Sequence, residues 1–465
     1  MITIVAAKDL RELLRDGRLA WSGALIVLLM LVALATGWNR QAQVNSERIA
    51  GQALDYEAWL QQGPRHPHDA AEQGMHVFKP EPPLAAFDPG IEPFVGSTVW
   101  LQAHRQSELK FRPAQDATGL QRFGELSPAW ILQVLLPLLV IVVGFNAVSG
   151  ERERGTLRQL LSIGVPTRSL LLGKAAALAS CVAILVVPPA VAFAIFVVAR
   201  VPAPERLDLL YRMAWLTAGY GVYVGFYILL TLAVSALARS SRTALVVLLG
   251  FWVTATLIVP RTASEAANLL YPTPSRLEFT DHLSHDIAKA AGEAWHHHFG
   301  VRKQWDASLP LSKWGAALKV DDEAGYGVLD ATFGRLWDTF EKQQGLQQWL
   351  GIVAPVIALR DFSMGLSGTD FSQHRDFSSA AEAQRRKIQD IVSQDLIDNA
   401  DPLGNAHFTY KAQPALWASV PQFKYESPRV SFALAHHWPA LALLGVAFFA
   451  AALLAGYGIS RPLMR

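Results

Sequence analysis

Histidine and glutamate side chains recur within one short stretch in the second half of the chain. His282, His285, Glu293 and His296 follow one another at close to whole helical turns, so a helix would bring them to one face. Imidazole and carboxylate groups together suit a transition metal. The stretch holds no cysteine and no fixed fourth ligand. A polar helix face is therefore the favoured interpretation, and these four residues are only candidates for a metal site.

A second group of polar residues could act in hydrolysis. Asp370 and His374 are one helical turn apart, and the same spacing recurs at Glu382 and Arg386. No Gly-x-Ser-x-Gly string or other nucleophile accompanies them. We therefore expect structural roles, with Thr369 or Asp370 as a helix cap. An ion pair between Glu382 and Arg386 is also expected.

The chain lacks a phosphate-binding loop. The nearest string begins at Gly164 and ends in Gly173-Lys174-Ala175. It has too many residues between its glycines, and Ala175 stands where serine or threonine would bind magnesium. Any ATP-driven work must therefore draw on another polypeptide, and we expect no cofactor in this chain.

Composition indicates a membrane protein. Of the 465 residues, 51% are hydrophobic and only 17% are charged, against about 25% charged in ordinary soluble proteins. The apolar content excludes a disordered chain, and the single cysteine, Cys181, excludes a disulfide-built module. The net charge of +2 gives no electrostatic footprint for nucleic acid.

Several apolar runs have the length of about 20 residues that a bilayer core requires. We therefore predict an α-helical polytopic membrane protein with six transmembrane helices. The predicted spans are residues 19–38, 129–148, 170–199, 213–237, 244–260 and 438–459. Residues 1–18 mix charges with a stripe of leucines, which is typical of a helix at the membrane surface.

Lysine and arginine predict the orientation. They gather on one side of the predicted bundle, in residues 1–18, 149–169, 238–243 and 460–465. The short loop on the other side holds Arg200, Arg206 and Arg212. Because positive charge concentrates on the cytoplasmic side, both termini are expected there. The long segments 39–127 and 262–437 then lie outside the cytoplasm.

These two segments are predicted to form a large, mainly helical extracytoplasmic domain. Thr280 is expected to cap a helix that runs to about Gly300. Apolar residues repeat at helical spacing over 326–350 and 377–399. Proline-rich strings in the first segment predict turns and short strands instead.

The loop 149–169 carries the most distinctive string of charges. The residues of interest are Glu151, Arg152, Glu153, Arg154, Gly155, Thr156, Leu157 and Leu160. They predict a short amphipathic helix, interrupted at Gly155, with charges toward the cytoplasm and leucines toward the membrane. Such a segment can receive a push from a soluble partner. A solvated loop that only satisfies the orientation rule is the alternative.

This string, with Pro166, Arg168 and Gly173-Lys174 before the next span, resembles the coupling-helix region of ABC-2 type permeases. These are membrane subunits of ATP-binding-cassette transporters. The resemblance implies a six-span protein of the bacterial inner membrane with both termini cytoplasmic. It also implies that the loop docks on a separate ABC ATPase subunit, which holds ATP and magnesium. Since six spans are half of the twelve that such exporters need, a second permease copy or a paralogue is implied.

Two further stretches extend the resemblance to the extracytoplasmic segments. They are residues 76–90, which include His76-Val77-Phe78-Lys79-Pro80, and residues 368–386. These resemble the branch of ABC-2 permeases with a large periplasmic insertion, related to gliding-motility and nitrous-oxide-reductase maturation permeases. A domain that caps the path, or hands cargo to a periplasmic partner, is implied.

The predicted function is therefore that of a permease subunit of an ABC-2 exporter, which is not itself an enzyme. The alternative is a non-transporting membrane sensor or scaffold with a ligand- or metal-binding periplasmic domain. A sensor would need a cytoplasmic output domain, whereas the predicted inner segments are short.

Overall fold

The structure is a computed structural model that describes residues 1–103, 106–107, 126–301, 303–304 and 306–460. Two parts of the sequence predictions lie outside these ranges. They are most of residues 104–125, in the predicted first extracytoplasmic segment, and the arginines Arg461 and Arg465 after the last span. Within them, six helices are long and apolar enough to cross a membrane, which confirms the predicted fold class. They are Gly17–Leu60, Pro128–Glu153, Thr167–Arg200, Ala203–Leu237, Ser241–Leu270 and Val430–Ser460.

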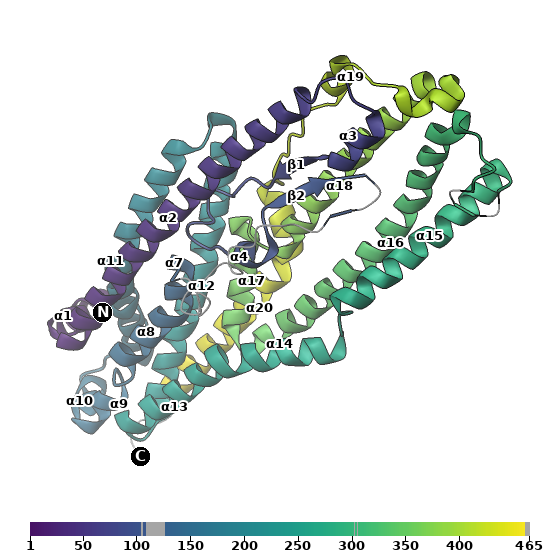
Figure 1. Ribbon diagram of the computed structural model, residues 1–465. Coiled ribbons are helices and arrows are strands. Elements are labelled where there is room, and N and C mark those ends of the chain that lie inside the picture. Colours follow the sequence, from purple (N-terminus) through teal and green to yellow (C-terminus); the bar gives the residue numbers. More distant parts are fainter. Residues whose placement is uncertain (104–105, 108–125, 302, 305, 461–465) are drawn as a thin grey trace.

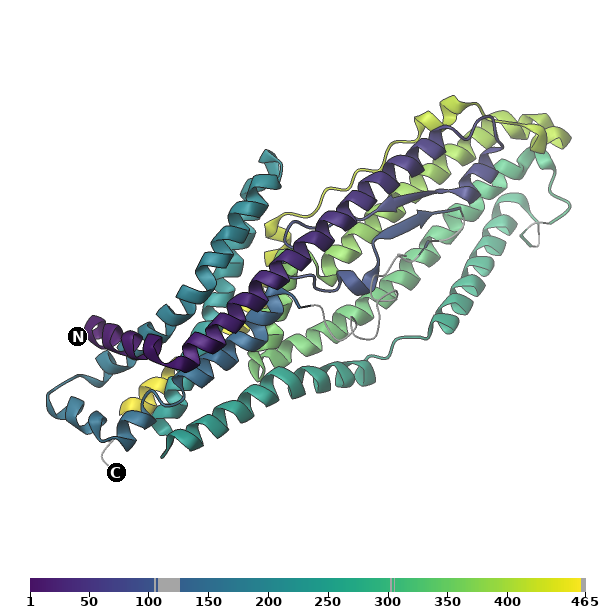
Figure 2. The ribbon, with the colours of Figure 1, turned by 60° about the vertical axis from the view of Figure 1, so that its left-hand side comes forward.

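The molecule is elongated, and both described ends of the chain lie at the same end of it (Figures 1 and 2). The helix bundle at this end is built around α12 (Arg206–Leu237). This helix packs along α20 (Val430–Ser460), α11 (Thr167–Arg200) and α8 (Leu136–Gly144). A buried apolar cluster runs through the bundle and includes Tyr223, Tyr227 and Leu232. We call the remaining part, residues 39–103 and 271–429, the distal domain.

The first membrane helix is much longer than its predicted span. Helix α1 (Ile2–Arg15) ends at Asp16, whose carboxylate accepts the backbone N–H of Arg18 and so caps α2 (Gly17–Leu60). With 44 residues, α2 continues far beyond residue 38 into the distal domain. The polar residues after residue 38 end the hydrophobic run, but they include good helix formers and no helix-breaking proline.

Short strands and helices follow α2, as its proline-rich continuation predicted. Strand β1 (Met75–Phe78) pairs with β2 (Thr98–Leu101) in antiparallel register, with Met75 opposite Leu101. Helices α3 (Pro67–Gln73) and α4 (Glu92–Val95) flank them. The hairpin covers α18 in Figure 1.

A membrane helix leads into the long helices that form the rest of the distal domain. Helix α13 (Ser241–Val253) continues through a π-helical turn into α14 (Val259–Leu270). The chain then forms α15 (Arg276–Phe299), α16 (Trp314–Trp349), α17 (Pro355–Ser367), α18 (Phe371–Asp395) and α19 (Pro414–Ser419).

The predicted cap at Thr280 is wrong. Ser275 caps α15 instead, because its hydroxyl accepts the N–H of Glu278 while the Glu278 carboxylate accepts the N–H of Ser275. This reciprocal capping box starts the helix one turn earlier. Thr280 therefore lies inside α15, where its hydroxyl donates to the carbonyl of Arg276 at 2.8 Å.

The two inserted segments share one core. The indole of Trp59, at the end of α2, donates to the carbonyl of Trp417 in α19 at 3.1 Å. The Trp417 indole donates in turn to the carbonyl of Gly63 at 2.9 Å. Apolar side chains of both segments complete this core, among them Val77, Leu101, Phe377 and Val392. The distal domain is thus a single unit built from two insertions.

Candidate functional site

The distinctive loop lies at the end of the molecule that carries both termini (Figure 1). It contains α9 (Ser149–Glu153) and α10 (Thr156–Ser162), and we call Ser149–Ser162 the α9–α10 loop. Gly155 separates the two helices in the left-handed conformation, with φ of 75°. Glycine adopts this conformation without strain, and the predicted interruption at Gly155 is therefore present.

A buried ion network holds the start of this loop. The Lys174 ammonium in α11 lies 2.8 Å from a carboxylate oxygen of Glu151 and 2.9 Å from one of Asp9 in α1. Glu151 and Lys174 are 3% and 4% exposed. Lys174 is the buried cation for both carboxylates, and the half-exposed Lys8 lies 3.2 Å from Asp9 and 3.6 Å from Glu151. Each partner therefore depends on the others. The network ties the loop to both α1 and the third membrane helix.

The next two charged residues bind the turn between α12 and α13. The Arg152 guanidinium donates to the carbonyls of Ala236 and Ala238 at 2.6 and 2.5 Å. The Glu153 carboxylate accepts the backbone N–H and the hydroxyl of Ser241 at 2.7 and 2.8 Å. A cation thus faces the carboxyl end of one helix, and an anion faces the amino end of the next, which suits both helix dipoles.

The exposed surface of the loop runs from the end of α9 along α10. Leu157 is buried and Leu160 partly buried, whereas Arg154 and Arg158 are exposed. Ile163, directly after α10, is 73% exposed. The predicted outward-facing charges fall into two groups. Glu151 and Arg152 turn toward the bundle, whereas Glu153, Arg154 and Arg158 are exposed, although Glu153 also bonds Ser241. Sequence reasoning also missed Ile163, a large apolar side chain outside the leucine repeat.

A second buried network lies where α20 meets the distal domain. The two ring nitrogens of His437 lie 3.0 Å from a carboxylate oxygen of Asp361 in α17 and 3.0 Å from one of Asp370. Both acceptors are carboxylates, so both nitrogens donate and the ring is an imidazolium. Gly365 allows the close approach, since a Cβ there would lie 2.1 Å from the His437 ring.

The predicted roles near Asp370 are largely confirmed. Asp370 caps α18 by accepting the N–H of Ser372 at 3.0 Å, and the Glu382–Arg386 ion pair is present at 2.8 Å. Burial opposes ionisation of Asp370, but hydrogen bonds from His437, Ser372 and Gln373 bring the pKa of its carboxyl well below the usual range. Its pairing with His437 was missed.

Backbone contacts reinforce this junction. The Arg212 guanidinium in α12 donates to the carbonyl of Leu366 at 2.9 Å and to that of Pro428 at 2.5 Å. The Asp208 carboxylate accepts the N–H of Val430, the first residue of α20, at 2.7 Å. The distal domain is therefore fixed to two membrane helices by buried, charge-assisted hydrogen bonds.

The candidate metal ligands lie along α15. His282, His285, Glu293 and His296 are all exposed. Within the described ranges, no three histidine, cysteine or acidic side chains are placed to hold a metal ion. A single helix supplies the spacing, and among the described residues no neighbouring element completes a set of three ligands.

Glu81, in the turn after β1, gives a testable pH dependence. Burial raises the pKa of its carboxyl to about 7, although Arg40 opposes this shift. Since the folded pKa lies above the unfolded value of 4.5, stability is full below pH 4.5 and falls as the pH rises toward 7. Glu81→Gln is expected to raise the melting temperature at pH 8 but not at pH 4, with a gain of about 1–3 kcal/mol. The exposed Glu293→Gln serves as control, and an unchanged pH slope in Glu81→Gln would contradict the prediction.

Comparison with protein families identifies a match. A family model described as ABC-2 family transporter protein matches residues 3–381. The matched range includes α1, the α9–α10 loop, Lys174 and the first five membrane helices. No curated protein matches the chain.

Proposed function

Because the chain belongs to the ABC-2 family of transporter proteins, we propose that it is the permease subunit of an exporter driven by a separate ATPase subunit. It is a multi-pass membrane protein and a membrane subunit of an ATP-binding-cassette transporter. The further proposal is that the termini and the α9–α10 loop are cytoplasmic, in a bacterial inner membrane. The distal domain then lies in the periplasm, as the distribution of lysine and arginine indicates.

The observation that carries this proposal is the construction of the α9–α10 loop. Its base is bound to α1 and α11 through Lys174, and to the α12–α13 turn through Arg152 and Glu153. Its tip, with Arg154, Arg158 and Ile163, is exposed. A partner that pushes on α10 would therefore move several membrane helices together. We propose that this partner is a cytoplasmic ATPase with bound ATP and magnesium.

Assembly follows from the number of helices. Six helices long enough to span a membrane are described in the chain, and the proposed exporter needs two such bundles around its path. We propose that a second copy of this chain or a paralogue supplies the other bundle. The distal domain would cap the path or pass cargo to a periplasmic partner.

Docking is tested most simply at Ile163. Ile163→Asp places a charge where an apolar side chain is 73% exposed, so the fold should be unaffected while an apolar contact with the ATPase is lost. We expect at least about tenfold less ATPase to co-purify from native membranes, since burying an unpaired charge costs well over 1.4 kcal/mol. Leu403→Asp, at an exposed site of the distal domain, is the control. Equal recovery of ATPase with both variants would contradict docking at this site.

The conformation of Gly155 is tested by a matched pair of variants. Gly155→Ala puts a Cβ into a left-handed conformation, at a cost of about 1–2 kcal/mol, although no atom lies within 4 Å of that position. Asparagine tolerates this conformation better. We expect transport-coupled ATPase activity to fall in Gly155→Ala and to be largely retained in Gly155→Asn. Equal activity of the two variants would show that the backbone turn is not what matters.

A further inference from the structure

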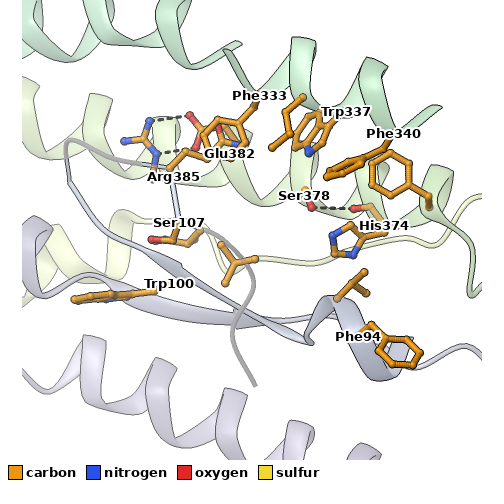
Figure 3. Close-up of a pocket in the computed structure, with 16 residues that line it drawn as sticks. Phe94, Trp100, Ser107, Phe333, Trp337, Phe340, His374, Ser378, Glu382 and Arg385 are labelled. Atoms are coloured by element: carbon orange, nitrogen blue, oxygen red, sulfur yellow. Dashed lines mark hydrogen bonds and ion pairs between the residues drawn. The ribbon is translucent and has the colours of Figure 1, made fainter. Parts of the chain in front are cut away.

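The two inserted segments of the distal domain meet over an incompletely filled interface. A cavity of about 260 Å³ lies between α16 and α18 on one side and the segment of α4 and β2 on the other (Figure 3). Its walls are mainly aromatic, with Phe333 and Phe340 from α16, Phe371 from α18 and Phe94 from α4. Because close packing is interrupted here, contacts elsewhere must help to hold the two segments together.

One such contact is a pair of buried histidines beyond the membrane helices. His66 directly precedes α3, which lies near the end of α2 in Figure 1, and His407 belongs to the segment Asp401–Thr409. Their ring centroids are 5.5 Å apart, and the two residues are 7% and 0% exposed. Trp314 and Phe408 pack on both rings at centroid distances of 5.0 to 6.2 Å. We call His66 and His407 the histidine pair.

The histidine pair joins one inserted segment to the other. Next to His66 in the chain, the backbone N–H of Arg65 donates to the carbonyl of Ala412 at 3.3 Å. The N–H of Ala412 donates in return to the carbonyl of Arg65 at 2.9 Å. Arg65 and His66 come from the first segment, and their partners come from the second. A short antiparallel bridge and a cluster of rings therefore close the interface at this end.

The surroundings of the histidine pair suit uncharged rings. The Nε2 atoms of His66 and His407 have no hydrogen-bond partner among the described residues. Protonation of either ring would therefore bury a cationic N–H without an acceptor, which is costly. A second proton would add repulsion between two neighbouring cations. Burial accordingly lowers the pKa of both imidazoles.

The charged groups around the histidine pair oppose this effect only in part. A carboxylate oxygen of Asp401 lies 3.2 Å from Nδ1 of His407, but the same carboxylate accepts two backbone N–H groups at the start of α16. On α3, Asp69 favours a charge on His66 and His68 disfavours it. The other charged side chains near the pair on these elements are exposed or bonded elsewhere, namely Arg65, Glu72 and Lys313.

We propose that the histidine pair is an acid-sensitive latch between the two inserted segments. The latch is closed while both rings are neutral, and it opens when a ring takes up a proton and moves into water. This inference is independent of the proposed exporter function. In the proposed orientation the latch faces the periplasm, so its state follows the pH on that side of the membrane.

Hydrogen exchange of the full chain in nanodiscs, followed by mass spectrometry at pH 7.5 and pH 5, tests the latch. Since the folded pKa of each imidazole lies below the unfolded value of 6.5, stability is present above pH 6.5 and is lost as the pH falls through the folded value. After correction for the intrinsic pH dependence of exchange, peptides of residues 61–73 and 401–412 should exchange at least about tenfold faster at pH 5. Peptides of residues 377–392, in the shared core of the distal domain, should not.

Phenylalanine variants identify the residues responsible. The double variant His66→Phe/His407→Phe keeps both rings but removes both titrating groups, so its peptides 61–73 and 401–412 should exchange equally at the two pH values. His297→Phe, at an exposed site on α15, should respond as wild type does. If the double variant is already open at pH 7.5, exchange of the imidazole C2 hydrogens in wild type decides instead, and both rings should titrate at a lower pH than His297.

Three results would overturn the proposal. The first is wild-type exchange at residues 61–73 and 401–412 that does not differ between pH 7.5 and pH 5. The second is a folded double variant that still responds to acid as wild type does. The third is a histidine pair whose rings titrate together with the exposed His297.

Discussion

Lys174→Met is expected to destabilise the protein by up to about 3–5 kcal/mol, because it removes the buried cation and leaves both carboxylates with only the half-exposed ammonium of Lys8. The ammonium is the ion partner of Asp9 and Glu151 in the network that joins α1, α9 and α11. Lower yield, a lower melting temperature and loss of transport coupling should appear together. Lys289→Met is the control, since Lys289 is exposed on α15.

A triple variant tests the role of charge in the same network. Adding Asp9→Asn and Glu151→Gln to Lys174→Met removes the unpaired charges and should recover most of the lost stability. Recovery of stability without recovery of coupling would separate the two roles of the network. A Lys174→Met variant that unfolds at the wild-type temperature would contradict this account of how the loop is held.

His437→Leu is expected to have an effect of similar size on the opposite side of the bundle. The imidazolium separates Asp361 and Asp370, at 3.0 Å from each, so its removal leaves two buried carboxylates facing a leucine. We expect a loss of about 3–5 kcal/mol, seen as earlier melting and faster proteolysis at the start of α17 and α18. His436→Leu is a matched control, because this neighbour on the same helix is exposed.

The pH dependence of this junction has a definite sign. The pKa of Asp370 is lowered despite its burial, so its stabilisation is present above the unfolded pKa and is lost only as the pH falls through the lower folded value. Wild type should therefore keep its advantage over His437→Leu at pH 4. Identical melting temperatures of the two proteins at pH 4 and at pH 7 would show that the ion pairs contribute nothing.

Local sequence patterns predicted the local structure well. The hydropathy of each span depends on one continuous run of residues, and all six helices are present. The Glu382–Arg386 ion pair is one helical turn apart and was predicted from that spacing. The start of α15 was misplaced because Thr280 and Ser275 are both good caps, and only the reciprocal contact with Glu278 selects Ser275.

Contacts between distant parts of the chain were not accessible in this way. His437 and Asp370 are 67 residues apart, and Lys174 and Asp9 are 165 apart. A single sequence contains no periodic signal for such pairs. The same reason explains the histidines of α15, whose spacing on one helix cannot show whether a second element supplies the missing ligands.

The aromatic cavity illustrates a third case. Phe333 and Phe340 belong to the apolar repeat of α16, which the sequence presented as an ordinary core face. Their partners Phe94 and Phe371 come from other segments. Only the packing of the two insertions shows that this face of α16 borders a cavity and is not fully covered by other side chains.

Cross-linking from position 163 in native membranes tests the central claim most directly. A photoreactive amino acid replaces Ile163, whose side chain is 73% exposed at the end of α10, and a second protein carries it at Leu403 in the distal domain. Mass spectrometry then identifies the captured protein. The account predicts a nucleotide-binding ATPase subunit at position 163 and not at position 403. Capture of no ATPase at position 163, from membranes in which the protein is intact and abundant, would contradict the account and favour a sensor or scaffold.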